Sequence, residues 1–440
     1  MKYRIEELNS LYKFIEREKI QESSEEKLAE KIADIRLIFQ LLNKEDIRVC
    51  LYLVAIDTKK PKFIINLNNY YLKEEWQSNE NTENIYYILY NRRFLNRDRI
   101  KKVILMSLIE NIQFKINFDL FKLIVEYKDI ATLKILLENI FYDNKFILLM
   151  LHSYKHKIPY SYNQFKTIFH NEMTRVGLNE KDKDGSYPVL WACIKKNTKI
   201  VETLLMNYTK YNLIQDLNEK NKEGLYPLLQ ACYNNNIEMT KLLINYSDST
   251  NNILKINDKD RLGNYPLLKS CRFANIKLVK LLIRYANKNN IILKVNERDF
   301  RGDFPILDAC NTRTSKILEI LMKYADKNSI ALELNGINDY GYSPLMLASL
   351  FCRNRPMKYL IKYANKNNII LDIYNVNGKT SPVECAIDNL YIRGDIRPII
   401  LIMRYAKKHK IKMDEEYVKQ YRLYIKKNKF RYIKKRMAFI

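Results

Sequence analysis

A glycine that returns at a fixed interval is the feature of this sequence that most limits how the chain can fold. The interval is 39 residues between the first five members of the series and 37 residues before the sixth: Gly185, Gly224, Gly263, Gly302, Gly341 and Gly378. A proline follows each glycine after three residues, or after four in the last unit. Six of the nine glycines and six of the ten prolines therefore belong to one motif, which indicates tandem copies of a single supersecondary unit.

Each unit reads Asn-x-x-(Asp/Asn)-x-x-Gly-x-(Tyr/Phe/Ser)-Pro, followed by one apolar stretch and then a second that ends near a recurring tyrosine. The Asp or Asn side chain can bond its own backbone and start a turn, and the glycine allows a positive φ. The proline suits the first position of a helix. Each unit is therefore predicted to be a turn, a helix, a short loop and a second helix, with the turn started by Asp182, Asn221, Asp260, Asp299, Asn338 and Asn375.

This pattern resembles the ankyrin repeat, most clearly over residues 179–193, and the resemblance covers six repeats across roughly residues 177–406. It implies an all-α fold, an ankyrin-like α-solenoid of stacked helix-turn-helix repeats with β-turn or hairpin loops. Tyr226 and Leu229 replace the family's Thr and His, so apolar contact is expected where the family makes hydrogen bonds. A tyrosine stands where the family's second helix ends in glycine. The 39-residue period exceeds the usual length of about 33, so a longer second helix or connection is expected.

Outside the repeats the chain is also predicted to be helical. Residues 23–26 indicate a capping box that opens a helix with Leu28, Ile32, Ile35 and Phe39 on one face. Residues 121–127 and 129–137 indicate a degenerate helix pair. The expected organisation is an N-terminal α-helical region of unknown role (1–115), degenerate helical repeats (116–176), six ankyrin-like repeats (177–410) and a basic C-terminal capping helix or tail (411–440).

Little in the sequence predicts catalysis, and no catalytic, cofactor or metal site is assigned. Cys193, Cys232, Cys271 and Cys310 recur with the repeat, and equivalent positions in stacked helices lie about 8–10 Å apart, beyond the reach of a disulfide or a shared zinc ion. They are interpreted as small buried residues. The histidines His152, His156 and His170 are interpreted as surface residues, because a metal site needs three or four ligands. An enzyme within residues 1–176 would require a deep polar pocket.

The net charge of +26 allows a polyanionic partner, but Lys outnumbers Arg by 53 to 23, and abundant Lys, Asn, Ile and Tyr are typical of AT-rich codon usage. The sequence shows no apolar run near the roughly 20 residues that span a bilayer. Seven cysteines without a secretory signal favour a reducing compartment. The expectation is a monomeric protein of the cytoplasm or nucleus, with no membrane contact.

The resemblance implies a non-catalytic scaffold that binds a protein partner along the concave face made by first helices and turn tips. Positions that do not recur between repeats are the candidates, because the recurring ones hold the scaffold. Aromatic and Arg side chains are favoured among them. The candidate partner-binding residues are Trp191, Ile194, Tyr233, Lys269, Phe273, Phe300, Arg301, Tyr340 and Phe351.

The alternative function is binding of nucleic acid or another acidic partner through the C-terminal segment. Residues 404–440 hold 14 basic and 3 acidic side chains. Such a block is typical of the capping helix of a solenoid, of a nuclear-import signal or of a nucleic-acid contact, and these interpretations can coexist. The candidate basic patch is Lys426, Lys427, Lys429, Arg431, Lys434, Lys435 and Arg436.

Overall fold

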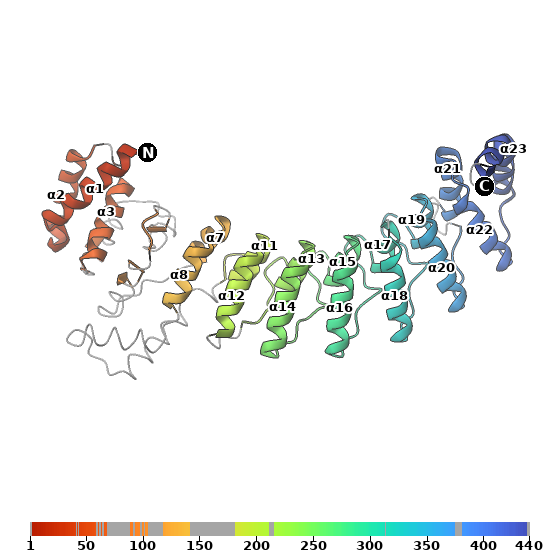
Figure 1. Cartoon of the computed structure of the whole chain (residues 1–440), viewed down its shortest axis with the longest axis horizontal. Coiled ribbons are helices and arrows are strands. Elements are labelled where there is room, and N and C mark those ends of the chain that lie inside the picture. Colours follow the sequence, from red (N-terminus) through yellow and green to blue (C-terminus); the bar gives the residue numbers. More distant parts are fainter. Residues whose placement is uncertain are drawn as a thin grey trace. The chain divides into compact units, whose positions relative to one another are not determined.

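The computed structural model describes residues 2–40, 44–58, 118–140, 181–210, 215–312, 314–374 and 381–437, with residue 42 and short stretches between 60 and 103 (Figure 1). Among these residues there are 18 α-helices and no strand, which confirms the all-α prediction. They form two compact units, Met1–Gln215 and Asp216–Ile440. Within the described residues, no helix combines the length and the apolar character needed to cross a membrane.

The first unit opens with a small helical cluster. Helices α1 and α2 both pack against α3, and α2 buries Leu28, Ile32 and Ile35 on one face, as predicted. The helix cap differs from the prediction: Ser24 rather than Ser23 precedes α2, and its side chain makes no capping hydrogen bond, so the predicted capping box is not formed. The elements are α1 (Lys2–Arg17), a 3-10 turn (Ile20–Glu22), α2 (Glu25–Ile38) and α3 (Lys44–Asp57).

Two helix pairs complete the described part of the first unit. The predicted degenerate pair is present as α7 (Phe118–Glu126) and α8 (Ile130–Ile140). It stacks on the first complete repeat, since α7 contacts α11 (Pro188–Ile194) and α8 contacts α12 (Thr198–Lys210). A segment that has lost the turn motif thus keeps the two-layer packing of a repeat.

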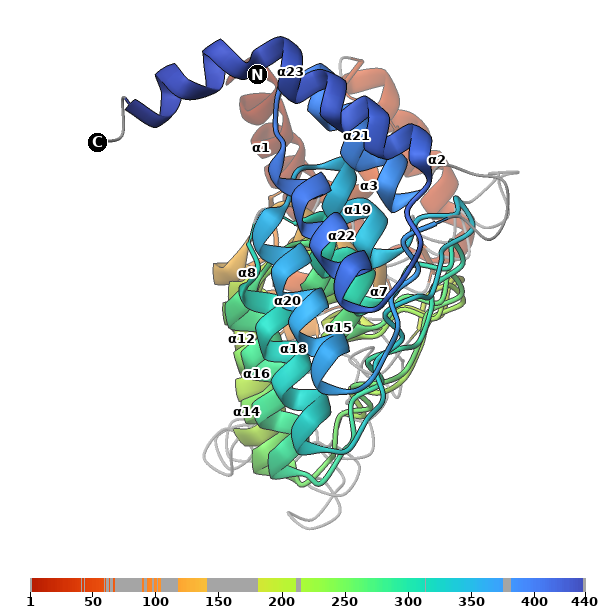
Figure 2. The same ribbon diagram turned by 90° about the vertical axis from the view of Figure 1, so that its right-hand side faces the viewer.

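The second unit is a stack of helix pairs (Figure 1). Each first helix begins at the repeat proline and contacts the next first helix, and each second helix contacts the next second helix, which gives two layers. Figure 2 shows the second helices side by side, with the turns and connections on the other side. The pairs are α13 (Pro227–Tyr233) with α14 (Ile237–Thr250), α15 (Pro266–Arg272) with α16 (Ile276–Lys288), α17 (Pro305–Asn311) with α18 (Lys316–Lys327), α19 (Pro344–Leu350) with α20 (Asn354–Lys366), and α21 (Pro382–Arg393) with α22 (Arg397–Lys408).

The tyrosine before each repeat proline joins one repeat to the next by hydrogen bonds. Tyr226 Oη donates to the carbonyl oxygens of Lys255 and Asp258, at 2.9 and 3.0 Å. Tyr265 Oη makes the equivalent pair of bonds one repeat later, at 2.8 and 3.0 Å. The prediction that Tyr226 gives only apolar contact is therefore wrong. The ring is buried, but its long side chain carries the hydroxyl to the connection of the following repeat, where buried carbonyl groups need donors.

The long connection between repeats is held by a ladder of asparagines, which are the first residues of the repeat motif. Asn257 Nδ2 donates to the Ile292 carbonyl at 2.7 Å, and its Oδ1 accepts from the Lys294 amide at 3.1 Å. Tyr285 at the end of α16 holds the preceding connection, because its hydroxyl accepts from the Leu254 amide at 2.8 Å. Side chains of neighbouring repeats thus hold these connections in place. The asparagines of the ladder are Asn218, Asn257, Asn296 and Asn335.

Removing the Tyr265 hydroxyl tests how much its two hydrogen bonds contribute to stability. Tyr265→Phe leaves two carbonyl oxygens without their donor, so we expect the free energy of unfolding to fall by about 1–2 kcal/mol. Urea denaturation followed by circular dichroism measures the change. Tyr340→Phe is the matched control, because Tyr340 lies 57 % exposed on a turn and its variant should unfold like the wild type. Equal stability of the two variants would show that the Tyr265 hydroxyl does not hold the connection.

Candidate functional site

The turns between repeats are built by one side chain each. Asp299 Oδ1 accepts from the amides of Arg301 and Asp303, at 2.9 and 3.0 Å, and the Gly302 amide donates to the Asp299 carbonyl. The repeat glycines Gly185, Gly224, Gly263, Gly302 and Gly341 have φ between 72° and 81°. Asp182, Asn221, Asp260 and Asn338 make the same pair of side-chain bonds as Asp299. This confirms the predicted turn mechanism for these five repeats, while Asn375 and Gly378 lie outside the described residues.

Successive turns are hydrogen-bonded to one another through the backbone. The Phe300 amide donates to the Leu262 carbonyl at 2.9 Å, and the Asp339 amide donates to the Arg301 carbonyl at 3.0 Å. The turns approach closely, since a Cβ placed on Gly263 would lie 2.8 Å from the Asp299 Cα. Glycine is required there by its positive φ and by this contact together. The turns at residues 221–224, 260–263, 299–302 and 338–341 therefore form one continuous edge.

Large side chains project from this edge into solvent. Leu262, Phe300 and Tyr340 are 48 %, 53 % and 57 % exposed, and each lies between the turn-starting residue and the glycine. The Arg301 guanidinium lies 4.9 Å from the centre of the Phe300 ring, a cation–π distance. The bonds that hold each turn come from its backbone and its turn-starting Asp or Asn, so these side chains are left available for contact. We call Leu262, Phe300, Arg301 and Tyr340 the tip face.

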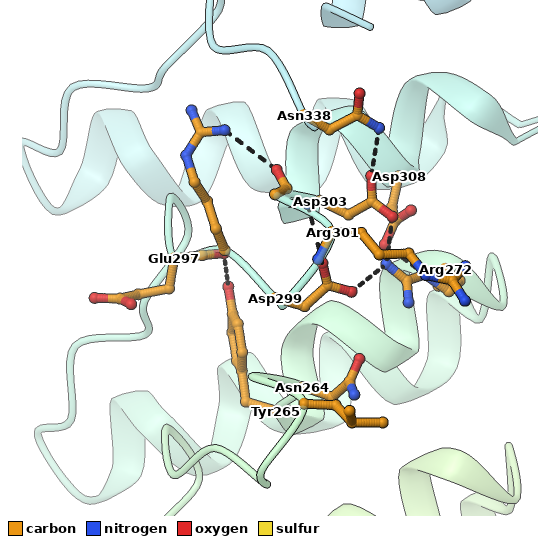
Figure 3. Close-up of polar contacts among 12 residues, drawn as sticks. Asn264, Tyr265, Arg272, Glu297, Asp299, Arg301, Asp303, Asp308 and Asn338 are labelled. Carbon is orange, nitrogen blue, oxygen red and sulfur yellow. Dashed lines mark hydrogen bonds and ion pairs between the residues drawn. The ribbon is translucent and has the colours of Figure 1, made fainter. Parts of the chain in front are cut away.

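A buried polar cluster supports the tip face from the adjoining first helices (Figure 3). Arg272, the last residue of α15, contacts three carboxylates at 3.0 Å: its Nη2 donates to Asp299 Oδ2 and Asp303 Oδ2, and its Nε donates to Asp308 Oδ2. Asn338 of the following turn donates to Asp303 Oδ1 at 2.8 Å. Asp299 thus starts the turn that carries Phe300 and also anchors that turn to α15.

The charges of this cluster do not balance. The pKa of Asp308 is raised to about 7, because burial in the first-helix layer and the neighbouring carboxylates of Asp303 and Asp299 together outweigh the opposing effect of Arg272. A single guanidinium shared among three carboxylates cannot compensate for the lost hydration of the most buried one. The same carboxylates raise the pKa of Arg272, which keeps its charge.

Two predicted partner-binding residues belong to a neighbouring part of this layer. Tyr233 Oη donates to Asp260 Oδ2 at 2.5 Å, and the Lys269 ammonium lies 4.2 Å from the centre of the Tyr233 ring. Lys269 is only 8 % exposed, and burial lowers its pKa. Both side chains therefore make contacts within the stack, which places them beneath the tip face rather than on it.

The other predicted residues are spread over both units. Trp191 is half-buried in the first unit, where the ammonium groups of Lys122 and Lys195 lie 5.1 and 4.7 Å from its ring centre, and Ile194 is also half-buried. In the second unit, Phe273 is 45 % exposed where α15 ends, whereas Phe351 is half-buried. Only Phe300, Arg301 and Tyr340 come together as an exposed group on adjacent turns. Leu262 was missed, although its place between a turn-starting Asp and the repeat glycine could have identified it.

The remaining sequence candidates lie in scaffold positions or outside the described residues. The recurring cysteines are buried between the packed helices, and burial raises the pKa of the Cys232 thiol to about 12, which keeps it protonated and unreactive. His152, His156 and His170 lie outside the described residues. In the first unit, a cavity of about 670 Å³ has Tyr90, Arg93 and Asp129 in its lining. The Asp129 carboxylate in it accepts from Tyr90 Oη and from the Thr132 amide at the start of α8.

The C-terminal segment forms α23 (Glu415–Met437), which packs against α21. Tyr417 Oη donates to Glu384 Oε1 at 2.7 Å, and Tyr391 Oη donates to the Gln420 carbonyl at 3.1 Å. These contacts support the capping-helix interpretation for the first half of α23. Of the candidate basic patch, Lys426 and Lys427 are exposed, and the side chains of Lys429, Arg431, Lys434, Lys435 and Arg436 lie outside the described residues.

Comparison with known proteins agrees with the architecture. A family model for ankyrin repeats (3 copies) matches residues 120–251 and 209–292. The match begins inside α7, within the segment predicted to hold degenerate repeats. No curated protein matches the chain.

Proposed function

The chain belongs to the ankyrin-repeat family, whose repeats generally mediate protein–protein interaction, and we propose that it binds a protein partner through the tip face. The exposed aromatic pair Phe300 and Tyr340 on adjacent turns is the observation that carries this proposal. A few residues provide most of the binding energy of a protein interface, and aromatic and Arg side chains are enriched among them. A protein partner with an apolar pocket and an acidic rim would fit Phe300 and the neighbouring Arg301.

The rigidity of the turn edge supports the same conclusion. The turns started by Asp260, Asp299 and Asn338 are each fixed by their own side-chain bonds and by a backbone bond to the preceding turn, and Arg272 contacts the Asp299 carboxylate. Binding therefore orders only the side chains of the tip face, which lowers the entropic cost of association. The repeats provide the frame, and the residues that differ between repeats provide the specificity.

The wider role follows from these features. We propose that the protein acts without catalysis, as a monomeric adaptor. All seven cysteines are free thiols, which supports action in a reducing compartment, the cytoplasm or nucleus. Residues 1–115 form a separate helical region in this proposal, and residues 411–440 cap the stack.

Photo-crosslinking from the tip face tests the interaction. A photoreactive phenylalanine analogue at position 300 or 340 should crosslink one protein in lysate of the source cells. The same analogue at position 292 or 370 should not, because Ile292 and Ile370 are equally exposed but lie on the connections. With the captured partner purified, Phe300→Ala should weaken binding about tenfold by titration calorimetry, and Ile292→Ala should leave it unchanged. Equal crosslinking from all four positions would contradict the proposal.

A further inference from the structure

The second helices of the last four repeats carry a concentration of positive charge, on a surface separate from the tip face. Helices α16, α18, α20 and α22 together hold 15 Lys and Arg residues and two acidic residues, Glu319 and Asp326. All 15 cations are exposed. We call them the outer helix face: Lys277, Lys280, Arg284, Lys288, Lys316, Lys323, Lys327, Arg355, Lys358, Lys362, Lys366, Arg397, Arg404, Lys407 and Lys408.

The base composition of the coding sequence does not explain this concentration. The first helices of the same four repeats, α15, α17, α19 and α21, hold three basic and three acidic residues. Codon bias would act on both layers alike, since they alternate along one stretch of chain. The excess of cations is therefore a property of one face of the second unit.

Among the described residues, most of these cations make no ion pair. Glu319 pairs with Lys316 and Lys323, and the other ion pairs of the face bind Lys288 to Asp248, Lys366 to Asp326 and Arg397 to Asp395. Ten cations make no ion pair within the described residues. They are Lys277, Lys280, Arg284, Lys327, Arg355, Lys358, Lys362, Arg404, Lys407 and Lys408.

The cations form a regular array. Arg284, Lys323 and Lys362 are 39 residues apart and occupy the same position on adjacent helices, which pack about 8–10 Å from each other. Within α16, Lys277 and Arg284 are seven residues apart, or about 10 Å along the helix axis. Positive charges thus recur about every 10 Å both along each helix and from one helix to the next. The four stacked helices make a strip about 30 Å long.

The side chains of the outer helix face favour one kind of polyanion over the others. The exposed large hydrophobic side chains of the described residues lie outside these four helices, so the face presents no fully exposed apolar side chain to insert into a membrane or to anchor a protein partner. Their aromatic residues are buried or half-buried tyrosines, which leaves no platform for the unstacked bases of a single strand. A duplex needs only cations at its phosphates, and it carries about 18 negative charges along 30 Å of its axis.

We propose that the outer helix face binds the phosphate backbone of double-stranded nucleic acid without regard to sequence. The net charge of its helices, +13, complements one side of a duplex laid along the stack. This surface lies on the second-helix layer, whereas the tip face lies on the turns, so the two proposals are independent. It also differs from the C-terminal basic patch, which provides a matched control.

Fluorescence anisotropy with a labelled 20-base-pair DNA duplex between 50 and 200 mM NaCl tests the proposal. The wild type should lose affinity steeply with salt, and two unrelated duplex sequences should bind equally. The variant Lys280→Gln/Arg284→Gln/Lys358→Gln/Lys362→Gln removes four unpaired cations and should reduce the slope of log affinity against log salt by about 4. The control Lys426→Gln/Lys427→Gln/Lys434→Gln/Lys435→Gln changes the charge equally and should keep the wild-type slope. Circular dichroism shows whether both variants keep the helical fold.

Three results would overturn the proposal. A wild-type slope in the outer-face variant would show that these cations do not contact the duplex. Loss of binding in the C-terminal control alone would move the contact to α23. Binding of the wild type to vesicles of phosphatidylserine and phosphatidylcholine, with no binding to the duplex, would identify an anionic membrane surface as the occupant.

Discussion

Replacing Gly263 with alanine is expected to lower the free energy of unfolding by about 2–5 kcal/mol, because two separate penalties act at this position. The residue has φ of 74°, which costs an L-amino acid conformational energy. The new Cβ would also lie 2.8 Å from the Asp299 Cα and 3.2 Å from the Arg298 carbonyl oxygen, so the next turn must move. Urea denaturation measures the loss, and hydrogen exchange should place the faster-exchanging amides in the repeats on both sides of the turn.

Gly394→Ala is the matched control for this substitution. Gly394 has φ of 64° at the end of α21, but its added Cβ would meet only the Tyr424 hydroxyl, at 3.2 Å, the far end of a side chain that can shift. The expected loss is the conformational penalty alone, about 1–2 kcal/mol. If the two variants were equally stable, close packing between turns would not be a determinant of the stack.

The stability of the second unit is expected to fall by about 2–3 kcal/mol as the pH rises from 5 to 8, because of Asp308. The pKa of this carboxyl is about 7 in the folded protein and has the ordinary value of 3.8 in the unfolded chain. Between these values the folded state binds a proton that the unfolded state does not. Protonation therefore stabilises the fold below pH 7, and this contribution is lost as the pH rises through 7.

The free energy of unfolding, measured by urea denaturation at several pH values, checks the sign. The ion-pairing groups around Asp308 are Arg272, whose raised pKa keeps it charged, and the carboxylates of Asp299 and Asp303, which Arg272 also contacts. Asp308→Asn removes the titrating group at almost constant volume and should make the stability of the second unit independent of pH between 5 and 8. A variant with unchanged pH dependence would place the titration elsewhere.

Arg272 connects this electrostatic cluster with the proposed binding surface. Its guanidinium holds Asp299, and the same carboxylate binds the amides of the turn that presents Phe300 and Arg301. The position of the tip face thus depends on a half-buried arginine from the preceding repeat. A substitution at Arg272 is therefore expected to change both the geometry of the turn and the binding of a partner.

The repeat pattern in the sequence was sufficient to predict the helix pairs and their turns. A positive φ, a first-turn proline and an Asx side chain are local requirements, so the residues that satisfy them recur wherever the local structure recurs. The roles of Asp260 and Asp299 and the start of α15 at Pro266 were predictable for this reason. The N-terminal region has no such repetition, and there the predicted cap of α2 was wrong.

Contacts between repeats could be known only from the tertiary structure. The sequence shows Tyr265 and Asn257 as recurring residues, but their partners are 29 and 35 residues away, and spacing along the chain does not specify which backbone groups they reach. The burial of Lys269 and the sharing of Arg272 among three carboxylates likewise depend on how the helices of different repeats stack. The sequence by itself determined the fold of each repeat, since that fold follows from local backbone preferences. Which side chains became scaffold and which stayed exposed for binding was decided only by the tertiary structure, because burial and charge pairing arise between residues that are distant in the chain.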